Sequence, residues 1–140
     1  MRWPWSRKSS PRSAPHLELG ERGEDWAARY LRRQGYKILV RHFRSQAGEI
    51  DIVARHRDWL VFVEVKTRET EDYGAPSEAV NKTKQRHMSK VALDYLRLLN
   101  YPQIRFRFDI VEVLWHPGHP EPADIRLIQN AFDLTEPYLY

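Results

Sequence analysis

Two carboxylates and a lysine interrupt an apolar segment between residues 48 and 68, GEIDIVARHRDWLVFVEVKTR. Asp51 lies in its first half, and Glu64 and Lys66 directly follow the run WLVFV. Because burying an unpaired charge costs free energy, three charged residues in such a segment need a physical reason. Carboxylate oxygens are the protein ligands that Mg²⁺ prefers, and an ammonium group beside them can stabilise charge that develops on a phosphate. These residue types therefore suit metal-dependent hydrolysis of a phosphodiester.

A β-hairpin would bring the three side chains together. Residues 49–54 and 59–67 have the composition of strands, and residues 56–58 between them are typical of a turn. A tip centred between residues 57 and 58 puts Asp51 opposite Glu64, with Cβ atoms roughly 5 Å apart. Lys66 projects from the same face because it lies two residues beyond Glu64. The carboxylates would repel each other, and Mg²⁺ or Mn²⁺ between them would relieve that repulsion.

A simpler interpretation is that Glu64 and Lys66 form an ion pair at the solvent-exposed end of a strand. Two further carboxylates favour the metal site instead. One is Asp51 at the opposed position. The other is Glu24, which lies on the same face of a predicted helix as Ala27 and Leu31 and so points with the buried side. Gly20 and Gly23 in that helix predict a close approach of the backbone to another element.

The remaining pattern predicts an α/β fold with a mixed, five-stranded sheet. Helices are expected at residues 17–34 and 82–99, with Asn81 as the N-cap of the second. Strands are expected at 36–43, 49–54, 59–67, 104–115 and 125–130, and a polar loop at 68–78. The order α-β-β-β-α-β-β lets helix 82–99 serve as a crossover. The apolar stripe of this helix passes, toward its start, through Lys84 and Gln85, which could reach the carboxylates.

Composition bounds the domain organisation. The net charge of +4 comes from residues 1–17, which hold four basic residues and no acid. That Ser- and Pro-rich segment is expected to be a disordered tail, followed by one domain at 18–134 and an extension at 135–140. Its Trp3 and Trp5 could stack on bases, although a solvated leader without a specific role is the alternative. The absence of cysteine and of a long apolar stretch predicts a cytoplasmic protein without a membrane span.

Five stretches of the sequence resemble a known family. They are GERGEDWAARYL (20–31), GEID (48–51), FVEVKTR (62–68), AVNKTKQRHM (79–88) and RFDIVEV (107–113). The chain is similar to the YraN-type family of small bacterial proteins, which resembles the PD-(D/E)XK nuclease superfamily. The resemblance implies a restriction-endonuclease-like three-layer core, similar to that of archaeal Holliday junction resolvases. The proline that precedes the first acid in that superfamily is absent, since Ile50 precedes Asp51.

The resemblance also implies a set of functional residues. The implied catalytic residues are Glu24, Asp51, Glu64, Lys66 and the helix positions Lys84 and Gln85, with Asp51 and Glu64 as the metal ligands. DNA is the expected partner. Apart from the resemblance, the exposed stretch of Arg41, His42 and Arg44, together with Arg55, His56 and Arg57, could line a phosphate-binding rim, and a solvated charged face is the alternative. The residues expected to contact DNA are Arg41, Arg44, Arg55, Arg57, Arg68 and Lys82.

The expected activity is Mg²⁺- or Mn²⁺-dependent cleavage of DNA, on branched or structured substrates by resemblance to resolvases. Such enzymes need two active sites, which implies a homodimer. One alternative is a nucleic-acid-binding or assembly factor that keeps the fold but cleaves nothing. Another is a protein-interaction module that uses the aromatic tail.

Two other sites invite a functional interpretation. His116 and His119 have the spacing of metal ligands on a helix, but the prolines of HPGHP forbid a helix and favour a surface loop. Asp109 lies two residues after Arg107 on a predicted strand. It is expected to be a buried partner of an arginine, with a distant role at the site as the alternative.

Overall fold

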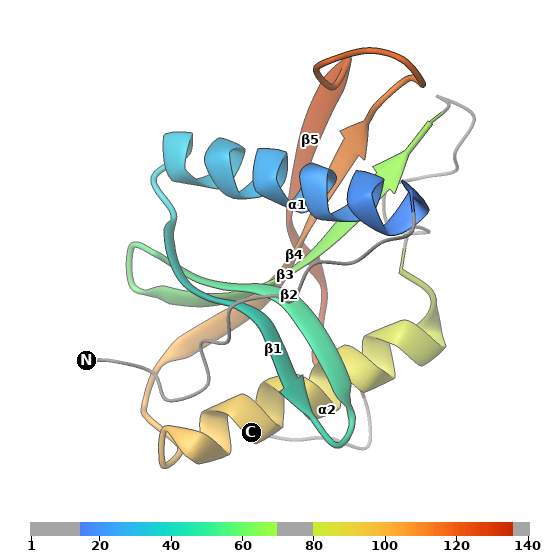
Figure 1. The fold of residues 1–140 in the computed structure, drawn as a ribbon. Coiled ribbons are helices and arrows are strands. Elements are labelled where there is room, and N and C mark those ends of the chain that lie inside the picture. The colour runs from blue at the N-terminus through green and yellow to red at the C-terminus, as the bar shows by residue number, and fades with distance from the viewer. Residues whose placement is uncertain (1–14, 70–79, 136–140) are drawn as a thin grey trace.

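The computed structural model describes residues 15–69 and 80–135 (Figure 1). The elements are α1 (Pro15–Arg33), β1 (Lys37–Ser45), β2 (Gly48–His56), β3 (Trp59–Arg68), α2 (Lys82–Leu98), β4 (Arg105–Leu114) and β5 (Asp124–Phe132). The predicted element order and fold class are confirmed. The predictions for residues 1–14, for most of the loop at 68–78 and for residues 136–140 lie outside the described residues.

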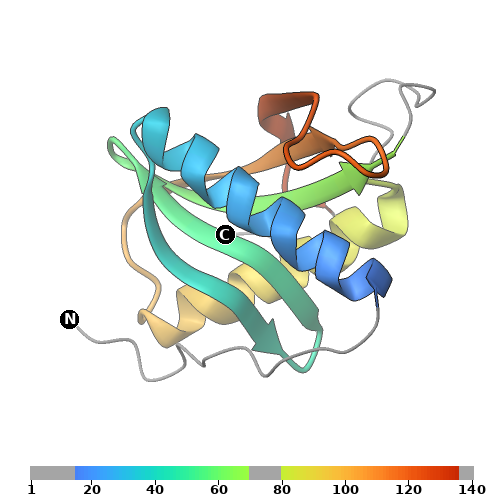
Figure 2. The same ribbon diagram turned by 45° about the horizontal axis from the view of Figure 1, so that its top comes forward.

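The five strands form one mixed sheet in the order β1-β2-β3-β4-β5. β3 and β4 are parallel, and the other neighbouring pairs are antiparallel. α1 lies across one face of the sheet and α2 across the other, as Figures 1 and 2 show. The chain therefore has the three-layer arrangement of a restriction-endonuclease-like core, with α2 as the crossover between the parallel strands.

Each helix buries an apolar stripe against its own face of the sheet. Ala27, Ala28 and Leu31 of α1 pack with Val61 and Val63 of β3. On the opposite face, the predicted stripe of α2 packs with residues from four of the five strands; its buried members are Met88, Val91, Ala92, Tyr95 and Leu96. β3 is thus the interior strand, covered on both sides, that its sequence predicted.

α1 begins at Pro15, slightly earlier than the predicted start at residue 17. Proline is well tolerated in the first turn of a helix, because its missing N–H would have no partner there. At the other end, Gly35 adopts φ +90, the left-handed conformation expected after a helix C-terminus. Within the described part of the chain, no helix combines the length and the apolar character needed to cross a membrane.

Gly23 makes the close approach that its position in α1 predicted. A Cβ at this residue would clash with Oγ1 of Thr67 and lie only 3.2 Å from the Thr67 Cβ. Gly23 therefore sets the distance between α1 and the end of β3 that carries Lys66.

Gly23→Ala is expected to lower the free energy of unfolding by about 1–3 kcal/mol, because overpacking outweighs the gain in helix propensity. Urea denaturation of the variant measures this change. In the double variant Gly23→Ala/Thr67→Ala most of the loss should be recovered, because the side-chain atoms nearest the new methyl group are gone. A Gly23→Ala variant with the free energy of unfolding of the wild type would show that α1 and β3 are not in tight contact.

Candidate functional site

The hairpin of β2 and β3 has the predicted register. Its tip is Arg57-Asp58, and its paired residues run from His56↔Trp59 to Ile52↔Val63. Asp51 and Glu64 are the next residues on the two strands, so each is opposite the other in the extended register.

The pairing of the two strands ends at Ile52↔Val63, and Figure 1 shows β2 and β3 diverging from each other. Asp51 Oδ2 accepts a hydrogen bond from the Val65 backbone N–H at 2.8 Å, so a side-chain carboxylate takes over where the backbone ladder ends. This bond fixes Asp51 relative to β3 at the level of Glu64.

The first two strands bend at the same place. Ile50 and Val53 both lie in the core beneath α2, although strict alternation would put residues three apart on opposite faces. Val40 and Phe43, their partners in β1, do the same. Between them, in β1, His42 adopts φ +57, a left-handed conformation that is uncommon for a residue with a side chain. The candidate site therefore lies where β1 and β2 turn under α2 while β3 continues straight.

Glu64 is a buried carboxylate with an unsatisfied oxygen. The residue is 5% exposed, and its Oε2 has no hydrogen-bond partner. Burial raises the pKa of Glu64, and the ammonium groups of Lys84 and Lys66 offset part of that rise.

Asp51 is perturbed in the same direction and more strongly. Burial raises the pKa of Asp51 well above its ordinary value, and the charges of Glu64 and Glu24 raise it further. The hydrogen bond from Val65 and the ammonium of Lys84 lower it only in part. Two neighbouring carboxyl groups thus share a site in which their charged forms are costly, and a proton or a cation is needed to relieve that cost.

Two lysines bring positive charge to the pair from different elements. Lys66 follows Glu64 on β3. Lys84 comes from the first turn of α2, where Asn81 caps the helix by accepting a hydrogen bond from the Lys84 N–H at 2.9 Å. The Lys84 Nζ lies 3.5 Å from Glu64 Oε1. Gln85 instead donates its side-chain amide to the Val80 carbonyl at 2.9 Å, so of the two helix candidates it is Lys84 that contacts the carboxylates.

Glu24 lies near this pair but is engaged by β1. Its Oε2 lies 2.8 Å from His42 Nε2 and 3.6 Å from a terminal nitrogen of Arg41. The other ring nitrogen of His42, Nδ1, lies 2.6 Å from Glu49 Oε1. These two carboxylates, Glu24 first, raise the pKa of His42 to about 10. The imidazolium therefore bridges α1 and β2 immediately beside Asp51.

His42 was not predicted to lie beside the carboxylate pair. This position could have been predicted from the register of the first two strands. β1 and β2 pair across the turn Gln46-Ala47, with Arg41 opposite Ile52 and Phe43 opposite Ile50. Counting across that turn places His42 opposite Asp51.

The basic residues predicted to bind DNA are divided between several places. Arg41 and Arg44 are ion-paired, with Asp25 at 2.8 Å and Glu49 at 3.2 Å. Lys82 begins α2, and Arg68 ends β3 two residues after Lys66. The two arginines of the hairpin, Arg55 and Arg57, lie at its tip, roughly 13 Å or more along β2 from Asp51. The structure does not bring these two together with the carboxylates.

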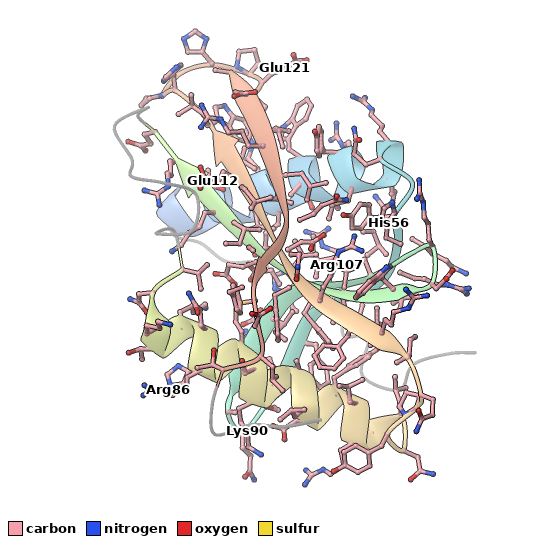
Figure 3. All side chains as sticks on the ribbon, turned by 180° about the vertical axis from the view of Figure 1, so that it is seen from behind. His56, Arg86, Lys90, Arg107, Glu112 and Glu121 are labelled. Atoms are coloured by element: carbon pink, nitrogen blue, oxygen red, sulfur yellow. The ribbon has the colours of Figure 1, made fainter. Side chains whose placement is uncertain are left out.

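Glu112 is another buried carboxylate, and its burial was not predicted from the sequence. It is 2% exposed, neither of its oxygens has a hydrogen-bond partner, and its backbone pairs with Lys66 in the ladder between β3 and β4. Burial raises the pKa of Glu112, while the charges of Arg68 and Arg126 on the neighbouring strands lower it in part. Figure 3 labels Glu112 on β4.

Glu112→Gln is expected to raise the free energy of unfolding at pH 7 by about 1 kcal/mol, because it removes a buried charge without a hydrogen-bond partner. A carboxyl whose pKa is raised in the folded state costs stability as pH rises above its ordinary value, so the gain should shrink toward pH 4. Guanidinium denaturation at both pH values measures it. The exposed Glu121, which is also labelled in Figure 3, gives the matched control Glu121→Gln. A Glu112→Gln variant less stable than wild type would mean that the carboxylate is stabilising after all.

The other sequence candidates lie where they were expected. His116 and His119 are in the loop after β4, and the ring of His116 contacts the Glu69 carbonyl at 2.9 Å. Asp109 is fully buried and accepts a hydrogen bond from Arg107 Nε at 3.0 Å, as the structural interpretation predicted. Asp109 also accepts from Tyr36 Oη at 2.7 Å, so its carboxylate is satisfied within the core.

The described residues contain no group of three or more histidines or acidic residues that could hold a metal ion. The candidate metal ligands are therefore the two carboxylates Asp51 and Glu64. One or two carboxylates are enough for Mg²⁺, which keeps several of its waters and completes its shell with substrate phosphate. The mixed sheet between two helices, forked at a carboxylate pair with adjacent lysines, defines a restriction-endonuclease-like α/β protein.

Comparison with known proteins gives the family. The model of the "Uncharacterised protein family UPF0102" matches residues 23–113, and the chain belongs to this family, the YraN family. A UPF0102 protein of Caldicellulosiruptor saccharolyticus is 46% identical over 115 residues, which cover 82% of this chain and 97% of the relative. UPF0102 proteins of Geobacter sulfurreducens and Rhodococcus opacus are 49% and 45% identical, covering 84% and 85% of this chain and 90% and 99% of the relatives.

Proposed function

We propose that the protein is a Mg²⁺- or Mn²⁺-dependent endonuclease that hydrolyses phosphodiester bonds in DNA. The observation that carries this proposal is the adjacent pair of the partly buried Asp51 and the buried Glu64, with lysines on two elements beside it and one oxygen of Glu64 without a hydrogen-bond partner. Because a protein core gains nothing from two adjacent carboxyl groups with raised pKa values, a bound cation is the best reason for the arrangement.

The residues present fit such a cation. Hard divalent cations bind carboxylate oxygens, and Glu64 Oε2 is a buried oxygen without a hydrogen-bond partner. Asp51 and Glu64 would hold the ion. When bound, Mg²⁺ neutralises charge on the phosphate and lowers the pKa of the attacking water.

The lysines would act on the charges of the reaction. Lys66 would place its ammonium beside the phosphate and stabilise the negative charge that builds up on its oxygens, or help to deprotonate the attacking water. Lys84, 3.5 Å from Glu64 Oε1, lowers the pKa of Glu64 and so favours the carboxylate form that a cation needs. Glu24 would tune the site through its charge, or position a water molecule or a second ion, if its contact with His42 opens.

DNA is the substrate that the basic residues near the carboxylate pair support best. Lys82 and Arg68 lie at the ends of the two elements that carry Lys84 and Lys66, where a phosphate backbone would pass. The resemblance to resolvases favours branched or structured DNA. Cutting both strands of such a substrate needs two sites, so the proposal includes a homodimer on the DNA.

A second candidate is a nucleic-acid-binding or assembly factor that keeps this fold without cleaving. The engagement of Glu24 by His42 and Arg41 favours it, because this acid is then not free to position water or a second ion. The presence of all three residues Asp51, Glu64 and Lys66 argues against this second candidate. A protein that only binds nucleic acid gains nothing from negative charge at the place where a phosphate must lie.

Cleavage assays with linear duplex, single-stranded and four-way-junction DNA test the proposal, each in Mg²⁺ and in Mn²⁺. We expect cleavage of at least one substrate by the wild type and none by Asp51→Ala. Cleavage untouched by this substitution would contradict the catalytic assignment. DNA binding without cleavage of any substrate would favour the second candidate.

A further inference from the structure

The outer face of α2 carries an unusual line of positive charge. Lys82, Arg86, Lys90 and Arg97 fall within an arc of about 80° when residues advance 100° around the helix, and the buried stripe lies on the other side. We call these four residues the α2 stripe. It extends for about 22 Å at 1.5 Å per residue. Figure 3 shows two of its members, Arg86 and Lys90, on the side of α2 that faces away from the sheet.

Helix stability does not explain the basic residues at the start of α2. The first turn of α2 contains no acidic residue, and it contains Lys82 and Lys84, although the N-terminal end of a helix disfavours cations. The last turns of both helices follow the favourable pattern, with Arg97 in α2 and Arg32 and Arg33 in α1. A binding role for an anion accounts for basic residues that oppose the helix dipole.

Acidic residues neutralise little of the positive charge of the α2 stripe. Asp94 is the one acid of α2, and it lies 3.2 Å from Lys90. The remaining members, Lys82, Arg86 and Arg97, have no ion pair with another described residue. All three are exposed.

A concave surface runs beside the second half of the stripe. A hollow of about 600 Å³ separates α2 from the turn between β1 and β2. Lys90 and Arg97 line one wall, and Arg44 lines the other. At the N-terminal end of α2, Lys84 contacts Glu64 from the sheet-facing side of the helix, so the stripe begins at Lys82, two residues before the lysine that reaches the candidate active site.

We infer that the α2 stripe binds the phosphate backbone of duplex DNA, with its Lys82 end beside the site of Asp51 and Glu64. This inference rests on the proposed function, because it names the surface by which DNA reaches that same site. A straight line of charges on a rigid helix suits a stiff polyanion, and 22 Å of duplex carries about 13 phosphates. α2 is described over its whole length and offers no exposed Phe, Tyr or Trp on which bases could stack, which favours duplex over single strand.

Fluorescence anisotropy with a labelled 20-base-pair duplex between 50 and 200 mM salt tests the inference. Arg86→Ala/Arg97→Ala should weaken binding on the order of tenfold and reduce the slope of log affinity against log salt by about 1.8, since each phosphate contact contributes about 0.9. The matched control, Arg32→Ala/Arg33→Ala, removes the same charge from α1 and should change neither quantity. Arg86→Lys/Arg97→Lys should restore the slope, because the charge is retained.

Calorimetry with Mn²⁺ separates this surface from the carboxylate site. The Arg86→Ala/Arg97→Ala variant should bind Mn²⁺ as the wild type does, and loss of both Mn²⁺ and DNA binding would overturn the inference. Equal weakening in the α1 control, unchanged binding in the α2 variant, stronger binding of an acidic peptide than of duplex, or no duplex binding by the wild type would also overturn it. A wild type that binds duplex through α2 but neither binds Mn²⁺ nor cleaves would support the inference and contradict the proposed function.

Discussion

Lys66→Met is expected to lower the rate of DNA cleavage by about 10²–10³-fold while leaving Mn²⁺ binding intact. Methionine keeps much of the length and the apolar stem of lysine but removes the ammonium group. Asp51 and Glu64 still provide the metal ligands, so the loss should lie in the chemical step and not in assembly of the site. Single-turnover cleavage at saturating protein measures that step directly.

Lys37→Met is the matched control for this substitution. Lys37 is exposed at the start of β1, so its replacement removes the same charge without touching the carboxylates. If both variants cleave at the wild-type rate, Lys66 has no catalytic role. If Lys66→Met also loses Mn²⁺ binding, the lysine acts through the metal site and not on the phosphate.

His42→Gln is expected to lower the free energy of unfolding at pH 6 by about 2–3 kcal/mol, because it leaves Glu24 and Glu49 without their shared cation. The His42 ring nitrogens lie 2.8 Å and 2.6 Å from these carboxylates, and its side chain is 19% exposed. Glutamine can keep one hydrogen bond but not the charge. Denaturation by urea measures the loss.

The stabilisation by His42 should depend on pH with a defined sign. The pKa of the imidazole rises from 6.5 to about 10 on folding, so its contribution is fully present below pH 6.5 and is lost as pH rises through 10. The pKa of Glu49 is lowered, first by His42, so the contribution of Glu49 is lost as pH falls below its ordinary value. The difference between wild type and His42→Gln should therefore be largest between about pH 4.5 and 6.5 and should shrink toward pH 10.

His87→Gln provides the comparison, because His87 is exposed on α2. This control should have the stability of the wild type throughout. NMR titration of the imidazoles offers an independent check, since the ring of His42 should still be protonated at pH 8. A stability difference that grows between pH 6.5 and 10, or a His42 ring that titrates near its ordinary pKa, would contradict the ion bridge.

The register of the carboxylate hairpin could be predicted from the sequence because its turn is short. A two-residue tip at Arg57-Asp58 leaves little freedom in pairing, so counting from it places Asp51 opposite Glu64. The same count puts Arg55 at the tip and away from the carboxylates, although the composition alone had grouped it with the DNA-binding residues.

Features that depend on contacts between distant elements could not be predicted in this way. The left-handed φ of His42 belongs to the bend of β1 and β2 under α2 and to the contact with Glu24 of α1. The choice between Lys84 and Gln85 depends on the capping of α2, where the Gln85 amide is used by the Val80 carbonyl. The burial of Glu112 depends on the packing of β4 between β3 and β5, which alternation within one strand does not specify.

The carboxylate pair is costly to the folded protein unless something binds it. Asp51→Asn should therefore stabilise the metal-free chain by about 1 kcal/mol, as is common where a site is built for function at the expense of stability. The amide oxygen can still accept the hydrogen bond from Val65. The gain in stability and the affinity for a metal ion have the same origin, which is the repulsion between the neighbouring carboxylates of Asp51 and Glu64.

Titration calorimetry with Mn²⁺ at pH 7 on the wild type, Asp51→Asn and Glu64→Gln tests the central claim most directly. Both substitutions preserve the size of the side chain and remove one carboxylate from the pair. The wild type should bind one or more Mn²⁺ ions per chain with measurable heat, and neither variant should bind at that site. A wild type that binds no Mn²⁺, or variants that bind it as well as the wild type, would contradict the assignment of Asp51 and Glu64 as a metal site.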